Sequence, residues 1–226
     1  MKNVIPNAIT ALNLFLGMVA IVYVIKGAFI MGAIFIFFAL IADAMDGRAA
    51  RYFGVSSEFG KELDSLCDVV SFGVAPGILA YQFALQDNGL LGLLIAALFA
   101  VCGALRLARF NINTGTVKGY FMGLPIPAAG CVVASFTMLG IKPASWIYLL
   151  FVAICAYLMI STIRYPDFKG KEGEPIRLIP AIVSLLTGGY ILYIAPQGFL
   201  FVIFFTYVLF GILNTLFGMF SRPTAT

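Results

Sequence analysis

The sequence predicts an all-α polytopic membrane protein with about eight transmembrane helices. Of its 226 residues, 62% are hydrophobic and only 11% are charged, and the mean hydropathy is +1.04, whereas soluble domains are roughly 45–50% apolar. The apolar runs are continuous, as in residues 30–42 and 199–213, and so do not fit the alternating strands of a β-barrel. Because no long polar stretch interrupts them, we expect a single transmembrane domain over residues 1–226.

Apolar runs separated by charged residues, glycine or proline give the helices in order. The first run is interpreted as a transmembrane helix and not as a signal peptide, because no small-residue cleavage site follows it. The connection around Pro196 is short enough to be either a turn or a break within one helix. We expect a six-helix core over 1–163 and an additional helix pair over 177–219. The predicted helices lie near 8–25, 28–47, 63–85, 89–108, 124–140, 145–163, 177–194 and 198–219.

Short links alternate with the longer polar segments 48–62, 109–123 and 164–176, and this alternation predicts the sidedness of the chain. If the N-terminus is cytoplasmic, twelve of the fourteen basic residues lie inside, and only Lys26 and Lys142 lie outside. The positive-inside rule therefore predicts an N-in, C-in protein. A basic collar facing anionic lipid accounts for the net charge of +4, so membrane lipid and no nucleic acid is the expected partner.

The residue types restrict the chemistry. The chain has no histidine, so proton transfer or metal binding has to use carboxylates. The four cysteines lie in apolar runs without CxxC spacing, and we interpret them as small buried hydrophobic residues.

Two pairs of aspartates stand at helical spacing. Asp43 and Asp46 are three residues apart, and Asp64 and Asp68 are four apart, so each pair shares a helix face. We expect both pairs at the cytoplasmic ends of two antiparallel helices. Four adjacent carboxylates repel one another unless cations are present, and all-oxygen ligation favours Mg²⁺, Mn²⁺ or Ca²⁺. The alternative is a helix pair held by salt bridges to Arg48, Arg51 and Lys61.

Small residues lie between the two aspartate pairs. Gly47 and Gly60 stand where the helices are expected to leave and enter the loop, and a missing side chain there lets a base or a phosphate approach the backbone. Together with Ala50 and Arg51 they predict a nucleotide pocket, in which Arg51 contacts a phosphate.

The complete pattern is Asp43-x2-Asp46-Gly47-x2-Ala50-Arg51-x8-Gly60-x3-Asp64-x3-Asp68, and it resembles the signature of the CDP-alcohol phosphatidyltransferase family. Every position of that signature is filled, and the resemblance extends over the first six helices. It implies two divalent cations, Mg²⁺ or Mn²⁺, held by the four aspartates, with Asp68 as the base for the acceptor hydroxyl. It also implies a homodimer and favours a bacterial or archaeal plasma membrane.

The same resemblance implies a site for the CDP-linked lipid, CDP-diacylglycerol. Asn7 and Thr10 belong to a segment that resembles the start of the family's first helix, near the diphosphate, although either residue can instead be a helix cap. The implied binding residues are Asn7, Thr10, Gly47, Ala50, Arg51, Ser57 and Gly60.

Segments 57–76, 105–111 and 121–129 resemble the phosphatidylserine synthase branch of the family, which implies L-serine as acceptor and phosphatidylserine and CMP as products. The serine carboxylate needs a cation, and Arg106 and Arg109 share a face at the cytoplasmic end of the fourth predicted helix. Both can instead be membrane anchors. Residues 123–127 form either a pocket wall or a plain helix start. Loop 164–175 is either a solvated loop or a lid over serine.

Two other functions stay open. The same transfer to glycerol 3-phosphate or an inositol phosphate would need further clustered basic residues beside the metals. A cation transporter would hold its acidic site near the midplane of the membrane and would not need the glycine and arginine features of a nucleotide pocket.

Overall fold

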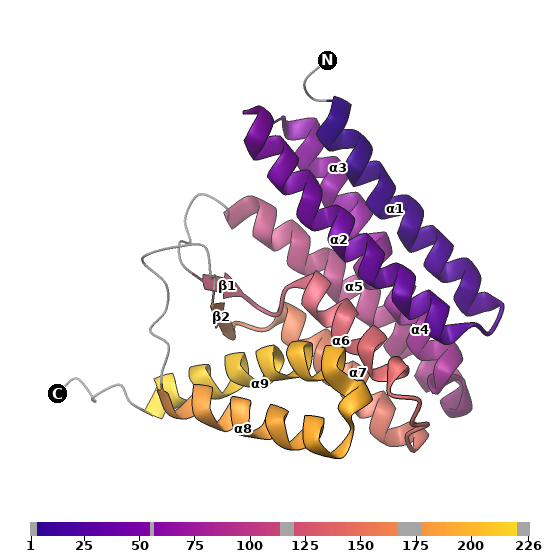
Figure 1. Cartoon of the computed structure of the whole chain (residues 1–226), viewed down its shortest axis with the longest axis vertical. Coiled ribbons are helices and arrows are strands. Elements are labelled where there is room, and N and C mark those ends of the chain that lie inside the picture. The colour runs from indigo at the N-terminus through magenta and orange to yellow at the C-terminus, as the bar shows by residue number, and fades with distance from the viewer. Residues whose placement is uncertain (1–3, 55–56, 114–119, 167–177, 221–226) are drawn as a thin grey trace.

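The computed structural model describes residues 4–54, 57–113, 120–166 and 178–220 (Figure 1). Helices account for most of these residues. The elements in chain order are α1 (Val4–Ile25), α2 (Phe29–Phe53), α3 (Glu58–Asp68), the π-helix Val69–Val74, α4 (Ala75–Phe83), the 3₁₀ turn Leu85–Asn88, α5 (Gly89–Asn113), β1 (Tyr120–Met122), α6 (Ile126–Met138), α7 (Ser145–Ile160), β2 (Arg164–Pro166), α8 (Leu178–Ile194), the 3₁₀ turn Pro196–Gly198 and α9 (Phe199–Phe220).

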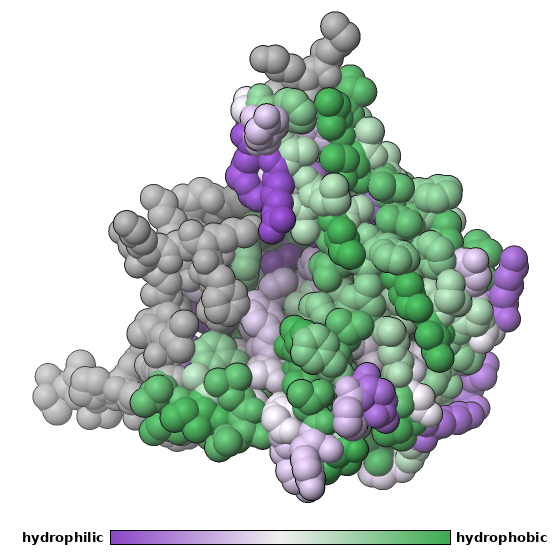
Figure 2. Space-filling view, viewed as in Figure 1, coloured by the Kyte–Doolittle hydropathy of each residue, from purple (hydrophilic) through white to green (hydrophobic). Residues whose placement is uncertain are grey.

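The helices confirm the predicted integral membrane protein. Five segments are long and apolar enough to cross a bilayer, with hydropathies of 1.5 to 2.4, and three shorter apolar helices accompany them. The long segments are Val4–Ile25, Phe29–Phe53, Glu58–Phe83, Leu85–Ile112 and Pro196–Phe217, and the shorter helices are α6, α7 and α8. These eight match the eight predicted helices in order. Hydrophobic residues cover most of the face shown in Figure 2, and hydrophilic residues gather at its edges and around a central hollow.

The segment expected to be a polar loop at 48–62 is instead mostly helical. α2 continues to Phe53, and α3 begins at Glu58. α2 ends at Gly54, whose φ of 62° is left-handed and whose N–H group bonds the carbonyls of Ala50 and Arg51. The prediction was wrong because charged residues were taken to end the helix, whereas a helix leaving the hydrocarbon tolerates them without breaking.

The helices pack around α6, which contacts α2, α4 and α9. α1 lies along α2 and also contacts α3 and α4. α8 and α9 lie side by side at the end of the bundle away from α1 (Figure 1). The link at Pro196 is therefore a true turn between two helices, which settles the alternative left open by the sequence.

A short β-ribbon joins two polar segments, and the sequence analysis did not predict it. β1 and β2 are antiparallel, with Phe121 opposite Tyr165. Next to β1, Gly123 has a φ of +79° and donates its N–H group to the carbonyl of Ile163 at 2.8 Å. Strands of three residues are too short to show an alternating pattern. The predicted break at 123–127 is present, and α6 starts within it at Ile126.

Candidate active site

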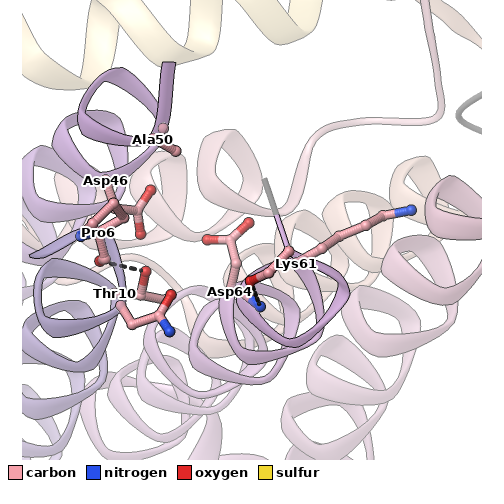
Figure 3. Close-up of a pocket in the computed structure, with 10 residues that line it drawn as sticks. Pro6, Thr10, Asp46, Ala50, Lys61 and Asp64 are labelled. Atoms are coloured by element: carbon pink, nitrogen blue, oxygen red, sulfur yellow. Dashed lines mark hydrogen bonds between the residues drawn. The ribbon is translucent and has the colours of Figure 1, made fainter. Parts of the chain in front are cut away.

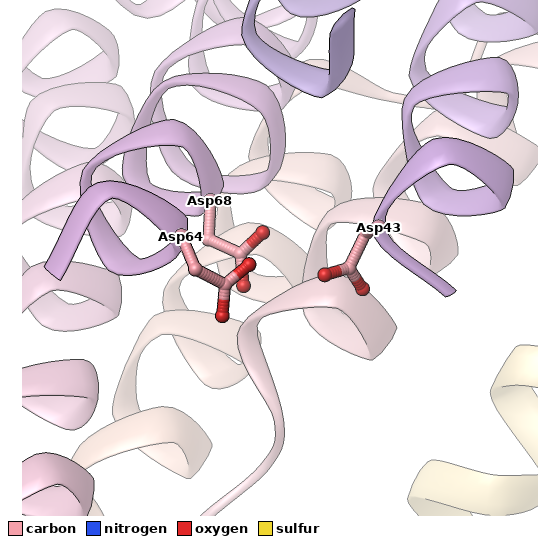
Figure 4. Close-up of side chains that lie close together, drawn as sticks. All are labelled: Asp43, Asp64 and Asp68. Carbon is pink, nitrogen blue, oxygen red and sulfur yellow. The ribbon is translucent and has the colours of Figure 1, made fainter. Parts of the chain in front are cut away.

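Three aspartates from two helices converge in the structure. Asp64 and Asp68 project from successive turns of α3 toward Asp43 on α2 (Figure 4). One carboxylate oxygen from each lies within 4.8 Å of the other two. Asp68 is buried, with only 6% of its surface exposed. Because the three groups carry the same charge and are partly withdrawn from water, this arrangement needs compensation by positive charge.

Asp46 lies beside this group and not within it. Its carboxylate lies beside the Thr10 side chain and lines a cavity together with Asp64. Four carboxylates were expected to converge. In the structure three of them lie close together, and the fourth, Asp46, lies on the wall of the neighbouring cavity. The aspartates also lie further inside the helices than expected. Asp46 stands seven residues before the end of α2 at Phe53, which is about 10 Å along the axis.

The oxygen atoms that line this site suit a divalent cation as ligands. Asp46 Oδ2, Asp64 Oδ1 and Asn13 Oδ1 are buried oxygens without a hydrogen-bond partner. An unsatisfied buried acceptor is costly, and hard oxygen atoms are the ligands that Mg²⁺ and Mn²⁺ prefer. The arginine part of the salt-bridge alternative is not supported, since neither Arg48 nor Arg51 forms an ion pair with these carboxylates among the described residues. An acidic cluster able to hold divalent metal is therefore present.

Asn13 is part of this site, and the sequence analysis did not identify it. The residue is fully buried, and its Nδ2 donates to Asp68 Oδ1 at 3.1 Å. The Ser71 hydroxyl donates to the backbone carbonyl of Asn13 at 3.0 Å, which ties α1 to the π-helix after Asp68. A fully buried amide inside an apolar helix needs a polar partner. The signal available in the sequence was therefore an asparagine deep in the first apolar run, one turn after Thr10.

A cavity of about 240 Å³ opens beside the acidic cluster, between α1, α2 and α3. Asp46 and Thr10 lie on one side of it, and Asp64 and Lys61 lie on the other (Figure 3). Six of the seven residues predicted to bind the CDP-linked lipid line it. The full lining is Pro6, Asn7, Thr10, Asp46, Gly47, Ala50, Ser57, Gly60, Lys61 and Asp64. The seventh, Arg51, is exposed and does not line it.

The two glycines keep this cavity open. Gly60 stands at the start of a helix as expected, whereas Gly47 does not stand at a helix end. Gly47 lies inside α2, and a Cβ atom there would meet nothing within 4 Å. Gly60 lies in the first turn of α3, where a Cβ atom would stand 3.1 Å from the Ser57 hydroxyl and 3.2 Å from Asn7 Oδ1. A side chain at either position would project into space that a ligand can use.

A helix cap was the alternative for Asn7 and Thr10, but the cap in this site is a third residue, Ser57. Ser57 is the N-cap of α3, and its hydroxyl accepts a hydrogen bond from the Gly60 N–H at 3.0 Å. Thr10 is no cap, because it lies inside α1 and its hydroxyl donates to the Pro6 carbonyl at 3.1 Å. Asn7 lies in the first described turn of α1 with its side chain on the cavity.

The two arginines predicted for the acceptor occupy different environments. Arg109 donates to the backbone carbonyls of Met122, Ile160, Met159 and Ser161 at 2.9 to 3.3 Å. Its two Nη groups are therefore bonded within the protein. Arg106 is buried, its Nε has no hydrogen-bond partner, and Asp68 is among the charged groups near it. Of the two, Arg106 is the one with a buried, unpaired donor close to the acidic cluster. The predicted lid segment lies mostly outside the described residues.

The fold and the site define an integral membrane protein with an acidic centre beside a cavity. The family model described as CDP-alcohol phosphatidyltransferase matches residues 3–164. The chain belongs to the CDP-alcohol phosphatidyltransferase family.

Curated relatives support the assignment to this family. A protein of Helicobacter pylori named CDP-diacylglycerol–serine O-phosphatidyltransferase is 39% identical over 221 residues, which cover 95% of this chain and 92% of the relative. A Bacillus subtilis protein of the same name is 40% identical over 176 residues, covering 76% of this chain and 95% of the relative. An archaetidylserine synthase of Methanothermobacter thermautotrophicus is 39% identical over 168 residues, which cover 74% of this chain and 71% of the relative.

Proposed function

We propose that this protein transfers the phosphatidyl group of CDP-diacylglycerol to the hydroxyl group of L-serine, giving phosphatidylserine and CMP. The observation that carries the proposal is the convergence of Asp43, Asp64 and Asp68 next to a cavity open at Gly47. The Helicobacter and Bacillus relatives are named for this reaction.

The cavity suits the CDP part of the lipid. The small residues Gly47 and Ala50 let a ligand approach the α2 backbone at the cavity wall. Asn7, Thr10 and Ser57 supply polar groups to the same cavity. Arg51 lies one turn beyond Gly47 on α2, from where a long side chain can reach a phosphate. The acyl chains remain in the bilayer, because the outer faces of α1 and α2 carry exposed apolar side chains.

The metal ligands are Asp43, Asp46, Asp64 and Asp68, for two ions of Mg²⁺ or Mn²⁺. Such ions, when bound, stabilise the charge on the diphosphate and on the departing CMP. The buried oxygens of Asp46 and Asp64 that lack hydrogen-bond partners support this assignment.

Asp68 is the general base. It accepts the proton of the serine hydroxyl while the serine oxygen bonds to the lipid-side β-phosphorus. The bond from that phosphorus to the oxygen of CMP breaks, and CMP leaves. The hydrogen bond from Asn13 to Asp68 Oδ1 fixes the carboxylate and favours its charged form.

Arg106 binds the serine carboxylate. A buried guanidinium with a free Nε, close to Asp68, can hold a carboxylate beside the base. Arg109, the other arginine considered for this role, already donates to four backbone carbonyls. We therefore assign the serine carboxylate to Arg106 alone.

The protein lies in the plasma membrane as an N-in, C-in homodimer, with its active site on the cytoplasmic side. The bias of twelve basic residues to two supports the orientation. The family resemblance supports the homodimer.

The test is an acceptor panel. Purified protein in lipid nanodiscs receives CDP-diacylglycerol and Mn²⁺ with labelled serine, glycerol 3-phosphate, inositol phosphate or no acceptor. We expect CMP release and a labelled lipid with serine. Preference for a phosphorylated acceptor would overturn the serine assignment, and no CMP release with any alcohol would overturn the transferase activity for this chain.

A further inference from the structure

Arg109 joins three parts of the chain that lie close together only in the folded protein. From the last part of α5 its guanidinium donates to Met122 in β1 and to the last carbonyls of α7 and Ser161. The carbonyls of Met159, Ile160 and Ser161 come from the C-terminal end of α7, where four acceptors lack partners within the helix. Arg109 therefore caps α7 and anchors the β-ribbon to α5 at the same time.

The fit around this guanidinium is close. Gly123 follows β1 in a left-handed conformation, with φ of +79°. A Cβ atom at Gly123 would overlap the Met159 carbonyl oxygen and would stand 2.7 Å from Arg109 Nη2. Glycine at this position therefore lets the ribbon lie against the end of α7 and the Arg109 guanidinium.

Arg106 lies one helical turn before Arg109 and is covered by the same ribbon. Its guanidinium carbon is 5.2 Å from the ring centroid of Phe110 and 5.9 Å from that of Phe121 in β1. The centroids of the two rings are 6.0 Å apart. Aromatic faces hold a guanidinium plane without using its N–H donors, so they orient Arg106 and leave its donors for a ligand.

We propose that Arg109 is a positioning residue for the acceptor alcohol: by anchoring β1, it holds Phe121 over Arg106 and fixes the guanidinium that binds the acceptor's carboxylate. This inference rests on the proposed function, in which Arg106 contacts serine. A small acceptor offers few contacts, and a guanidinium already held in place loses little freedom when it binds.

The strand itself supplies a matched control. Tyr120 is next to Phe121, and its ring covers a different arginine, with Arg164 4.6 Å from the centroid. Because neighbouring strand residues point to opposite faces, Tyr120→Leu removes an aromatic ring from the ribbon without uncovering Arg106.

The test measures the KM values for serine and for CDP-diacylglycerol in Arg109→Lys, Phe121→Leu, the double variant and Tyr120→Leu. Each of the first two is expected to raise the serine KM about tenfold and to change the lipid KM less than about twofold. The double variant is expected to be no worse than roughly the more affected single variant, because both changes act through one guanidinium. Tyr120→Leu should leave the serine KM unchanged.

Arg106→Lys separates this inference from the proposed function. If Arg106→Lys raises the serine KM and neither Arg109→Lys nor Phe121→Leu does, the positioning role of Arg109 is wrong while the acceptor site stands. If Arg106→Lys leaves the serine KM unchanged, the acceptor assignment itself is wrong. Should Arg109→Lys fail to fold, Phe121→Leu alone decides, since it changes neither the anchor nor a charge.

Discussion

At the level of residues, some side chains of the site supply charge and others hold the charged groups in position. Asp43, Asp64 and Asp68 supply carboxylates within 4.8 Å of one another, while Asn13 fixes one oxygen of Asp68. The arginines Arg106 and Arg109 have the same chemistry and the same helix face, but they differ in burial and hydrogen bonding, and we propose a different role for each.

Asp68→Asn should abolish most of the turnover. The amide keeps the shape of the side chain but cannot accept the hydroxyl proton, so kcat should fall by about 10²–10⁴-fold. CDP-diacylglycerol binding, measured by equilibrium titration, should persist. Near-normal turnover would show that another group is the base.

Asn13→Ala should lower kcat roughly ten- to a hundredfold, because hydrogen bonds to charged groups contribute about 1.5–3 kcal/mol. The KM for CDP-diacylglycerol should change little, since Asn13 does not line the cavity. Ser135→Ala is the control, because Ser135 is equally buried but bonds only the Val132 carbonyl of its own helix. Equal losses in the two variants would contradict a role specific to Asp68.

At the level of the helices, the length of α2 and α3 shapes the cavity, and a small residue sets how closely α8 and α9 pack. α2 and α3 extend past the aspartates, so the cavity is walled by helices and not by a loop. The α8–α9 pair lies away from α1 and packs on α6 through α9. Its two helices approach each other closely at Gly188, which faces Thr206 and Val202.

Gly188→Leu should destabilise the protein by about 1–3 kcal/mol by forcing α8 away from α9. A Cβ atom there would stand 3.2 Å from Val202 Cγ1 and closer still to the Thr206 hydroxyl. Gly189→Leu is the matched control, because nothing lies within 4 Å of a Cβ atom at Gly189. Thermal unfolding in detergent measures both, and equal melting temperatures for the two variants would refute this packing.

Over the whole molecule, apolar surface and buried acidic groups are combined in one fold. The outer faces of the helices carry exposed large hydrophobic residues, which suits lipid as the surrounding solvent. The carboxylates of Asp43, Asp64 and Asp68 gather inside the protein, where their like charges need compensation by positive charge.

Removing divalent metal should stop the reaction. Activity should disappear in excess chelator and return with Mn²⁺ or Mg²⁺, because the site offers only hard oxygen ligands. Zn²⁺ should restore less activity than either ion. Turnover that is indifferent to chelator would exclude metal-dependent chemistry.

The orientation can be tested with single-cysteine reporters. The native cysteines are all buried, so they should give little background with a membrane-impermeant maleimide. Tyr52 is 86% exposed at the end of α2, and the Lys142 side chain is 68% exposed in the link between α6 and α7. In intact cells Lys142→Cys should react, whereas Tyr52→Cys should react only after permeabilisation. The reverse pattern would show an N-out protein.

The sequence by itself determined the fold class, the order of the eight helices and the identity of the acidic residues. Continuous apolar runs and i, i+3 and i, i+4 spacings are local, so they can be read without knowledge of the fold. The tertiary structure alone decided that Asn13 contacts Asp68, that Asp46 stands apart from the other three acids, and that Arg109 bonds to carbonyls while Arg106 keeps a free donor. These outcomes depend on contacts between residues as far as 55 positions apart, and helical spacing carries no information about such contacts.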